Sequence, residues 1–496
     1  MSDTSYEVHP DGKVYSSGGS LVYTAANATL AIQWANNNLV NGGIIELPEG
    51  KFLITGMLKL NHSMVGAGVD QTQLVSASAY TSQMIYVMNP GESTPVNDLT
   101  FSDFEMNGRR DLYNSSVATT GGLAAIYAND CRFERLFIHD FPYSNGIEFW
   151  ASARNLISNC KIGNIGSLES YYGYGNGVCS GSKIPGVPTE DNVVEFCEIY
   201  GCTMVAVNWE PGRRNITRDC YMHDGTYWHE KNGSLQLSNA CRDSDYPGAP
   251  ISEGNQFIRC KIRQDNSIFA FRSAGPVLVQ GCDVGPANPA KAGTAAYVLG
   301  STGSVFEDNI IRIKAGGTGI YFNNSKGFTA RNNSIIEPSG SKTGKAIFCT
   351  GTAGSSLSGG TITGNKLYWT DYGVQLDSPM HGVTVSGNTA YNCGHPFYAV
   401  NADNVLSNNT VSVDSYFDTF LDAELSVEVI DIGGSVAIIG NLSNILGPMS
   451  GASVRFVADN GDVIAPVTTN ANGDFTRNYT PSKGGDVSIT AYYGTT

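Results

Sequence analysis

Charged side chains are scarce in this sequence, and those present are mostly acidic. They make up 15% of the 496 residues, with 30 Lys and Arg against 45 Asp and Glu. The formal net charge of −15 disfavours nucleic acid as a partner, because binding to phosphate needs a basic face. No apolar run approaches the length of a membrane span. We therefore expect neither a nucleic-acid-binding protein nor insertion into a membrane.

Metal-binding patterns are also missing. The eleven cysteines include no CxxC motif and no Cys/His spacing typical of zinc sites, and no run of Asp or Glu indicates a calcium site. We expect no metal and no cofactor. Five cysteines instead occupy equivalent places in repeated segments, where a free thiol acts as a small apolar filler. These are Cys160, Cys197, Cys220, Cys260 and Cys282.

The repeat is the dominant pattern of the chain. Each unit has a short alternating strand, a turn and a second apolar strand, and later units carry asparagine near the point where the earlier ones carry cysteine. Helical repeats would show an apolar stripe of period 3.6, whereas these segments alternate with period two and are interrupted by Gly, Asn and Ser. The sequence therefore predicts an all-β solenoid, a parallel β-helix. The asparagines are Asn309, Asn333, Asn365, Asn388 and Asn409.

The N-terminal sequence predicts a helix and resembles the opening of a known protein family. Residues 27–39 (NATLAIQWANNNL) have the pattern of a short amphipathic helix, which we expect to cap the solenoid. This helix, the stretch Gly42–Phe52 and the turn Gly66–Leu74 resemble the opening of the pectate-lyase-like superfamily. The resemblance implies a right-handed β-helix and a protein that binds or modifies polysaccharide. The opening is most similar to disaggregatase-type proteins of methanogenic archaea, which act on an acidic, chondroitin-like envelope polysaccharide.

The pattern changes near residue 423. From there, alternating strands are separated by Asn-Gly and Gly-Asp turns, which predicts a small antiparallel β-sandwich. Residues 454–491 resemble bacterial Ig-like modules. We therefore expect a catalytic β-helix over residues 1–422 and an Ig-like spacer or attachment module over residues 423–496.

Long polar loops indicate where a site lies. They occur at 109–121, 164–176, 181–192, 226–233 and 241–254, whereas the later coils carry fewer long insertions. A solenoid does not need such loops for stability, so their clustering predicts walls around a groove near residues 120–275.

Alignment of the coils on their cysteines predicts which residues face this groove. Because alternate strand residues point to opposite faces, Glu148 falls over Asn208, and Gln236 joins that column if the insertion after it is confined to a turn. Trp150, Glu210 and Arg272 fall in the neighbouring column. The inward positions between them are apolar: Ile147, Phe149, Val207, Trp209, Phe269 and Phe271.

Two further groups complete the predicted site. The loop GTYWHEKNG would place Tyr227, Trp228, His229 and Lys231 beside the groove, although an ordinary solvated turn explains it equally well. Arg213 lies in the turn after Glu210 and would favour an anionic chain, or would simply be solvated. His139-Asp140 and His223-Asp224 recur at equivalent positions, and this repetition favours a turn motif over catalysis.

Several activities fit these residues. The leading hypothesis is a secreted or surface-displayed, monomeric enzyme that hydrolyses an acidic polysaccharide. In it Glu148 and Glu210 act as acid and base, about 10 Å apart at the backbone if one coil lies between them. An alternative is β-elimination or C5 epimerisation by His229 or Tyr227, with Arg272 or Lys231 neutralising a uronate carboxylate. A third is a non-catalytic adhesin or scaffold.

Overall fold

A computed structural model describes most of the chain. The side chains of 235–239, 264, 269–273, 286, 419–420, 422, 424 and 447 are outside the description. The described residues are 4–77, 82–91, 94–112, 121–166, 175–181, 187–209, 211–225, 235–239, 252–264, 269–273, 275–286, 293–352, 357–413, 419–425, 434–444, 447–483 and 487–493.

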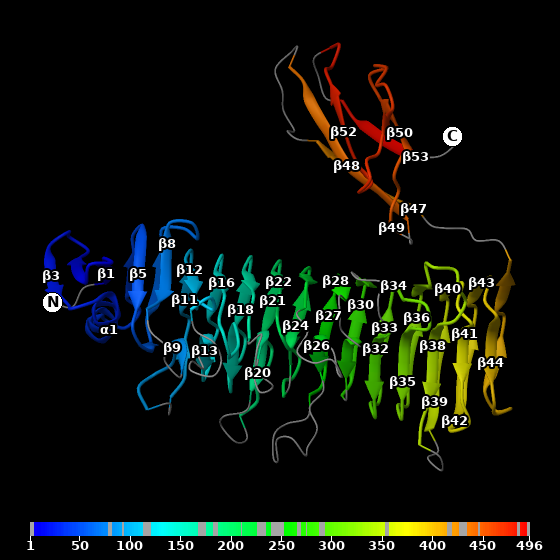
Figure 1. Ribbon diagram of the computed structural model, residues 1–496, viewed down its shortest axis with the longest axis horizontal. Helices are drawn as coiled ribbons and strands as arrows, with labels where there is room; N and C mark the ends of the chain where they lie inside the picture. Colours follow the sequence, from blue (N-terminus) through cyan, green and yellow to red (C-terminus); the bar gives the residue numbers. More distant parts are fainter. Residues whose placement is uncertain are drawn as a thin grey trace. The chain divides into compact units, whose positions relative to one another are not determined.

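Three long sheets run through residues 1–412, and each coil contributes one strand to each of them (Figure 1). We name them sheets A, B and C in the order in which a coil visits them. All pairings between successive coils are parallel, apart from the N-terminal ribbon of β1, β2 and β3 in sheet A. This arrangement confirms the predicted parallel β-helix.

Sheet A has 17 strands and follows directly after sheet C in each coil. Its strands are β1 (Ser5–Val8), β2 (Lys13–Ser16), β3 (Leu21–Thr24), β4 (Ile44–Leu47), β7 (Ser63–Gly66), β11 (Thr100–Ser102), β15 (Arg132–Glu134), β18 (Leu156–Ser158), β21 (Val193–Glu195), β24 (Ile216–Arg218), β27 (Asn255–Ile258), β30 (Val277–Gln280), β33 (Val305–Glu307), β36 (Phe328–Arg331), β39 (Leu357–Thr363), β42 (Met380–Ser386) and β45 (Val405–Ser407).

Sheet B has 14 strands. They are β5 (Gly50–Ile54), β8 (Thr72–Ser76), β12 (Glu105–Asn107), β16 (Phe137–His139), β19 (Lys161–Gly163), β22 (Glu198–Tyr200), β25 (Tyr221–His223), β28 (Lys261–Gln264), β31 (Asp283–Pro286), β34 (Ile310–Arg312), β37 (Ser334–Ile336), β40 (Lys366–Tyr368), β43 (Thr389–Tyr391) and β46 (Thr410–Ser412).

Sheet C has 13 strands, and most of the predicted site residues with described backbone lie on it or directly after one of its strands. They are β6 (Leu58–Leu60), β9 (Gln83–Val87), β13 (Gly121–Ile126), β17 (Ile147–Trp150), β20 (Asn176–Gly181), β23 (Val205–Asn208), β26 (Leu235–Asn239), β29 (Phe269–Ser273), β32 (Thr294–Leu299), β35 (Thr318–Asn323), β38 (Lys345–Thr350), β41 (Tyr372–Leu376) and β44 (His395–Ala399). A short pair, β10 (Val96–Asn97) with β14 (Ala128–Asn129), joins two turns.

The predicted helix is present as α1, Ala28–Asn38, near the start of the solenoid (Figure 1). The Asn27 side chain accepts a hydrogen bond from the Leu30 amide at 3.0 Å, which satisfies one of the free amides of the first turn. Ala31 and Ile32 are buried in the solenoid core. The apolar face of α1 is therefore covered by the first coil.

The corner between sheets A and B explains the cysteine and asparagine repeats. Each predicted cysteine is buried directly after a residue with a left-handed backbone, such as Asp219 before Cys220. The column then continues with asparagine: Asn309 accepts from the Cys282 amide at 2.9 Å and donates to Asn333 at 2.8 Å. Such a ladder satisfies every buried amide along its length, and it confirms that the two repeats share one position.

The interior is apolar, as expected. Ile147, Phe149, Val207 and Trp209 are all completely buried. Trp209 also donates its indole N–H to Thr217 Oγ1 at 3.0 Å, so its polar atom is satisfied inside the core. Phe269 and Phe271 lie on β29, whose side chains are outside the described set.

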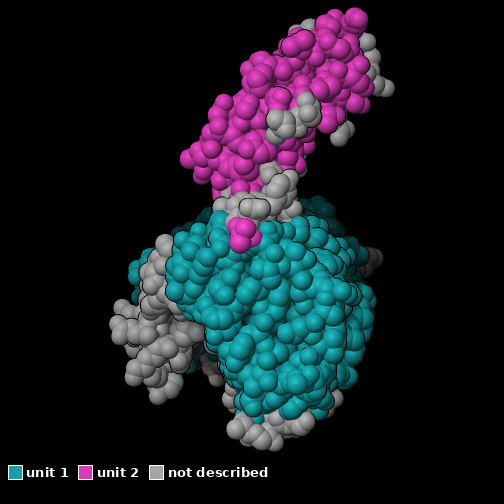
Figure 2. All heavy atoms as spheres, turned by 90° about the vertical axis from the view of Figure 1, so that its right-hand side faces the viewer, with its two compact units in different colours: residues 1–412 teal, residues 413–496 magenta. Residues whose placement is uncertain are grey.

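A second compact unit begins at Val413 (Figure 2). The expected boundary at residue 423 falls inside a strand of this unit. Two small antiparallel sheets share one hydrophobic core, which includes Ile438, Phe456 and Phe475. The strands are β47 (Thr419–Leu425), β48 (Val436–Asn444), β49 (Gly447–Pro448) and β52 (Asp474–Tyr479) in one sheet, and β50 (Ser453–Ala458), β51 (Val467–Thr468) and β53 (Ile489–Tyr493) in the other. Within the described residues, no helix is long and apolar enough to cross a membrane.

Candidate functional site

The strand register of sheet C fixes which predicted residues lie together. Glu148 pairs with Cys179, which pairs in turn with Asn208. Glu148 and Asn208 therefore share a column, as predicted, with one coil between them. Because neighbouring coils are about 4.8 Å apart, their backbones lie roughly 10 Å from each other.

Two placements in the predicted columns are wrong. The column continues from Asn208 through Ser238 to Arg272, so Arg272 shares the column of Glu148 and not that of Trp150. Gln236 lies two residues before Ser238 and is therefore outside this column. Arg272 was misplaced because it lies 10 residues before Cys282, whereas Glu148 lies 12 residues before Cys160, so the connection to the next strand is shorter in its coil. Gln236 was misplaced because the alignment assumed a wrong length for the insertion before Cys260.

Glu148 is buried on the outer face of sheet C. Its side chain accepts a hydrogen bond from Gln83 Nε2 at 3.1 Å, and Gln83 also donates to Ser144 at 2.8 Å. Burial raises the pKa of Glu148 above its usual value, against the opposing effect of hydrogen bonds that include those from Trp150 and Asn145. Glu148 is thus a carboxyl group that retains its proton to higher pH than an exposed glutamate.

Unpaired amide oxygens lie along the same part of the sheet. Gln83 Oε1, Asn176 Oδ1 and Asn208 Oδ1 are buried, and no described residue forms a hydrogen bond with them. Gln83 contacts Glu148 directly, and Asn176 bonds to Asn145 at 2.8 Å. A buried polar atom without a partner typically costs about 1–3 kcal/mol, so each of the three oxygens is a candidate acceptor for a water molecule or a ligand hydroxyl. The sequence alignment missed Gln83 and Asn176, because it compared only the residues level with Glu148 and Trp150.

Trp150 pairs in register with Gly181. A Cβ atom at Gly181 would lie 2.5 Å from the indole ring, so glycine leaves the space that the ring occupies. The ring is half-buried, beside the column of Glu148 and Asn208. This position is compatible with stacking against a sugar.

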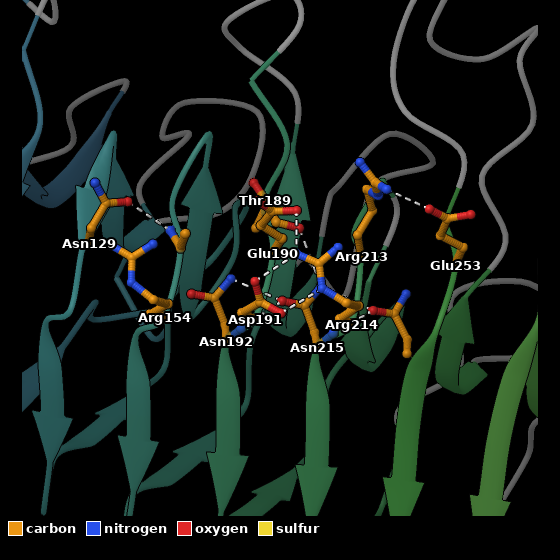
Figure 3. A network of polar contacts seen from close by, with 12 residues as sticks. Asn129, Arg154, Thr189, Glu190, Asp191, Asn192, Arg213, Arg214, Asn215 and Glu253 are labelled. Carbon is orange, nitrogen blue, oxygen red and sulfur yellow. Dashed lines mark hydrogen bonds and ion pairs between the residues drawn. The ribbon is translucent and has the colours of Figure 1, made fainter.

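Arg213 lies at the corner between sheets C and A, not within a strand of sheet C. Its Nη2 contacts Glu253 Oε1 at 2.7 Å, and Arg214 beside it bonds to Asp191 and Glu190 (Figure 3). The Arg154–Asp130 ion pair lies in the same column of turns as Arg214 and Asp191, in earlier coils. Ion pairing along the corner thus accounts for Arg213, and a role in substrate binding remains a prediction.

The other predicted residues are only partly described. Glu210, Tyr227, Trp228, His229 and Lys231 lie outside the described residues, so their roles remain predictions. Gln236 and Arg272 are placed by their backbone in β26 and β29. Among the described residues, no group of three His, Cys, Asp or Glu side chains could hold a metal ion.

The two His-Asp pairs form the same motif on sheet B. His139 Nδ1 contacts Asp140 at 2.7 Å and Nε2 contacts Glu105 at 3.0 Å. In the second copy His223 contacts Asp224 at 2.7 Å and Glu198 at 3.1 Å. The repeated geometry agrees with the interpretation as a structural motif of the turn.

Aromatic side chains continue the column of Glu148 beyond Arg272. The register leads from Arg272 to Tyr297, Tyr321 and Phe348. The ring centres of successive residues are 5.2 and 4.8 Å apart, which is the spacing of the coils themselves. All three rings are half-buried, so one edge or face of each remains accessible to a ligand.

Comparison with known proteins identifies the architecture. A family described as "Right handed beta helix region" matches residues 213–359 and 287–428. The fold is a right-handed β-helix. No curated protein matches the sequence.

Three solved structures illustrate the likeness. Tailspike protein 3 of bacteriophage CBA120 has a TM-score of 0.53 at 10% identity, covering 82% of this chain and 59% of that one. The tailspike protein gp49 of Pseudomonas phage LKA1 has a TM-score of 0.50 at 12% identity, covering 94% and 91%. The A-module of an Azotobacter vinelandii mannuronan C-5 epimerase has a TM-score of 0.47 at 14% identity, covering 78% and 96%. At these identities the likeness is one of fold.

Proposed function

We propose that this protein is an extracellular enzyme that cleaves glycosidic bonds of an acidic polysaccharide by hydrolysis, with Glu148 as the proton donor. The observation that carries the proposal is the burial of Glu148 among amide groups without a full set of partners. A general acid must hold its proton at the working pH, and a raised pKa provides this.

The surroundings of Glu148 suit a sugar. Hydroxyl groups donate hydrogen bonds readily to amide oxygens, and three such oxygens are unpaired here. Trp150 offers a ring for stacking, and the aromatic column further along sheet C offers more. A polymer lying along the solenoid axis would meet one new side chain at each coil.

Arg272 favours an anionic chain. It lies four coils from Glu148, which corresponds to about 19 Å between the backbones. At that distance Arg272 would contact a different sugar from the one that Glu148 protonates. It therefore fits recognition of a uronate elsewhere on the chain better than neutralisation at the cleavage point.

The second carboxylate remains Glu210 in this proposal. It follows β23 and is two residues beyond Asn208 in the sequence. A separation of about 6.5–9.5 Å between the two carboxyl groups would leave room for the attacking water of an inverting enzyme. The sequence resemblance adds the substrate class, a chondroitin-like envelope polysaccharide of the type that disaggregatases cleave.

Mass spectrometry of the products tests the proposal. The wild-type chain, incubated with a uronate-containing polysaccharide, should release fragments that have gained one water per cleavage, and Glu148→Gln should release far fewer. Glu198→Gln, on sheet B, is the matched control and should behave as the wild type. Products that together have gained no water, one of them carrying an unsaturated uronate, would instead indicate elimination, and unchanged chain length would indicate epimerisation or binding alone; each of these results would contradict hydrolysis.

A further inference from the structure

A pocket of about 860 Å³ lies on the outer face of sheet B, at its N-terminal end. Its walls come from strands β5, β8 and β12 and from the turns that follow β12, β16 and β19. None of the residues considered in the proposed function lines it. The volume is within the range of about 300–1,000 Å³ typical of small-molecule sites. Its charged and polar lining includes Lys51, Gln73, Glu105, Arg110, Asp140 and Asn164.

The acidic side chains of the pocket already have partners. Glu105 and Asp140 both contact the imidazole of His139, at 3.0 and 2.7 Å. Asp111 bonds to Arg109 at 3.0 and 3.3 Å. These contacts neutralise much of the negative charge, so the carboxylates leave little attraction for a cation.

Within the described structure, two basic side chains of the pocket lack the hydrogen bonds or ion pairs that its acidic side chains have. Nε and Nη2 of Arg110 are buried and have no hydrogen-bond partner among the described residues, although the Arg110 backbone amide donates to Asp140 O at 2.8 Å. Burial lowers the pKa of Arg110, and the nearby Asp140 charge opposes that effect. Within the described part of the chain, Lys51 also has no ion pair. An unpaired guanidinium and an unpaired ammonium on one pocket attract an anion, and the guanidinium fork suits a carboxylate.

Two polar groups beside these cations are also available. Gln73 donates through Nε2 to Glu105 at 3.0 Å, and Asn107 accepts through Oδ1 from the Arg109 amide at 2.8 Å. The other end of each amide, Gln73 Oε1 and Asn107 Nδ2, has no partner among the described residues. One is an acceptor and the other a donor, which matches the two roles of a sugar hydroxyl.

We propose that this pocket binds one acidic sugar residue, with its carboxylate held by Arg110 and Lys51 and its hydroxyls by Gln73 and Asn107. The choice of a sugar acid over other carboxylates rests on the proposed function; the preference for a carboxylate rests on the pocket alone. The pocket would then be a second contact for the polysaccharide, on a different sheet from Glu148. No bond is made or broken there.

Calorimetric titration of the full chain tests this inference with three probes: glucuronate, glucose and acetate. Glucuronate should bind saturably, and at least tenfold more tightly than either of the others, because only it carries both the carboxylate and the hydroxyls. Arg110→Gln should weaken glucuronate binding at least tenfold, and Lys51→Gln, at an exposed position that does not threaten folding, about threefold. Arg154→Gln, at an ion-paired corner outside the pocket, is the matched control and should bind as the wild type.

Three results would overturn the inference. They are no saturable glucuronate binding, equal binding of acetate and glucuronate, and unchanged affinity in both Arg110→Gln and Lys51→Gln. The proposed function is tested separately. A wild-type chain that binds glucuronate through Arg110 but cleaves no polysaccharide would support the pocket inference and contradict the proposed hydrolase activity. A wild-type chain that cleaves the polysaccharide but does not bind glucuronate would support the hydrolase activity and contradict the pocket inference.

Discussion

Sheets B and C belong to the same coils, yet the acidic side chains on their outer faces have different partners. On sheet B, Glu105 is bonded to His139, and Glu198 contacts both Lys161 and His223. On sheet C, Glu148 is buried with amide contacts, and none of the described residues forms an ion pair with it. A paired carboxylate stays ionised and stabilises the fold, whereas an unpaired buried one tends to stay protonated. In the proposed mechanism, this difference is the reason that Glu148 on sheet C, and not a carboxylate on sheet B, acts as the proton donor.

The two copies of the His motif extend this comparison within sheet B. Their hydrogen-bond distances agree within 0.1 Å. They differ in surroundings: Asp140 is 33% exposed and Asp224 is 71% exposed. Only the first copy borders the described pocket, so the motif itself is structural and its neighbours supply any further role.

The largest effect is expected when the unpaired carboxyl of sheet C is removed. Glu148→Gln should lower kcat about 10²–10⁴-fold, the usual contribution of a general acid. The same change should not destabilise the protein at neutral pH. Burial raises the pKa of Glu148 in the folded protein above its value in the unfolded chain, so folding is most stable at acid pH and loses stability as pH rises through the folded pKa. Glutamine does not ionise, so the variant does not lose stability in this way. Kinetics and thermal unfolding at pH 4 and 7 measure both effects.

A variant that retained full activity would contradict the role of Glu148. Glu198→Gln is the control on the paired sheet. It should leave kcat unchanged and lower stability slightly, because Lys161 and His223 lose their shared partner. Loss of activity in Glu198→Gln with full activity in Glu148→Gln would place the essential carboxyl group on sheet B and not on sheet C.

The next effect concerns the unpaired amides of sheet C. Asn208→Ala should raise KM about two- to tenfold, because a sugar hydroxyl loses its acceptor at a cost of about 0.5–1.5 kcal/mol. The free protein should be no less stable, since Asn208 Oδ1 has no partner to lose. Asn215→Ala, in the buried amide ladder at the corner between sheets C and A, should instead destabilise the fold. Equal loss of stability in both variants would contradict a ligand-binding role for Asn208.

The His motif gives an effect that depends on pH. Burial lowers the pKa of His139, but hydrogen bonds to Asp140 and Glu105 outweigh it, so the folded pKa lies above the usual value. The resulting stability is complete below the unfolded pKa, near 6.5, and is lost as pH rises through the folded one. His139→Gln should therefore cost about 1–3 kcal/mol at pH 5 and less at pH 8, as urea unfolding would reveal. A cost that grew with pH would contradict this linkage.

The smallest effect is expected in the aromatic column. Tyr321 lies between Tyr297, which it meets edge to face, and Phe348, on which it stacks, and its loss removes one aromatic surface of several. Tyr321→Ala should weaken binding of a long polysaccharide about three- to tenfold, in line with about 0.5–1.5 kcal/mol for an aromatic pair. Affinity for a short fragment that reaches only Glu148 should not change. Equal weakening for both ligands would indicate a general loss of folding.

The sequence predicted the repeat well because its cause is local. Cys220 and Asn309 each follow a turn residue with a left-handed backbone. The same turn precedes the other cysteines and asparagines of this column. The placement of Glu148 and Asn208 in one column followed from the same repeat. Gln236 was misplaced because of the insertion before Cys260, and Arg272 because the connection from it to Cys282 is shorter than the equivalent one from Glu148 to Cys160; alignment on the cysteines alone misses both differences in length.

The chemistry around Glu148 was less accessible from the sequence. Gln83 reaches Glu148 from a strand 65 residues away in the chain, and no periodicity marks that contact. The raised pKa likewise results from burial by surrounding coils. The pocket at Arg110 depends on which charges pair and which do not. Contacts of this kind depend on three-dimensional packing and not on residue spacing.

A crystal structure of Glu148→Gln soaked with an oligosaccharide of uronate residues tests the central claim most directly. We expect a sugar on the outer face of sheet C, with hydroxyls bonded to the amide oxygens of Asn176 and Asn208 and a glycosidic oxygen beside the substituted side chain at position 148. An oligosaccharide bound only elsewhere on the solenoid, with the sheet C face vacant, would contradict the assignment of this face as the site of cleavage.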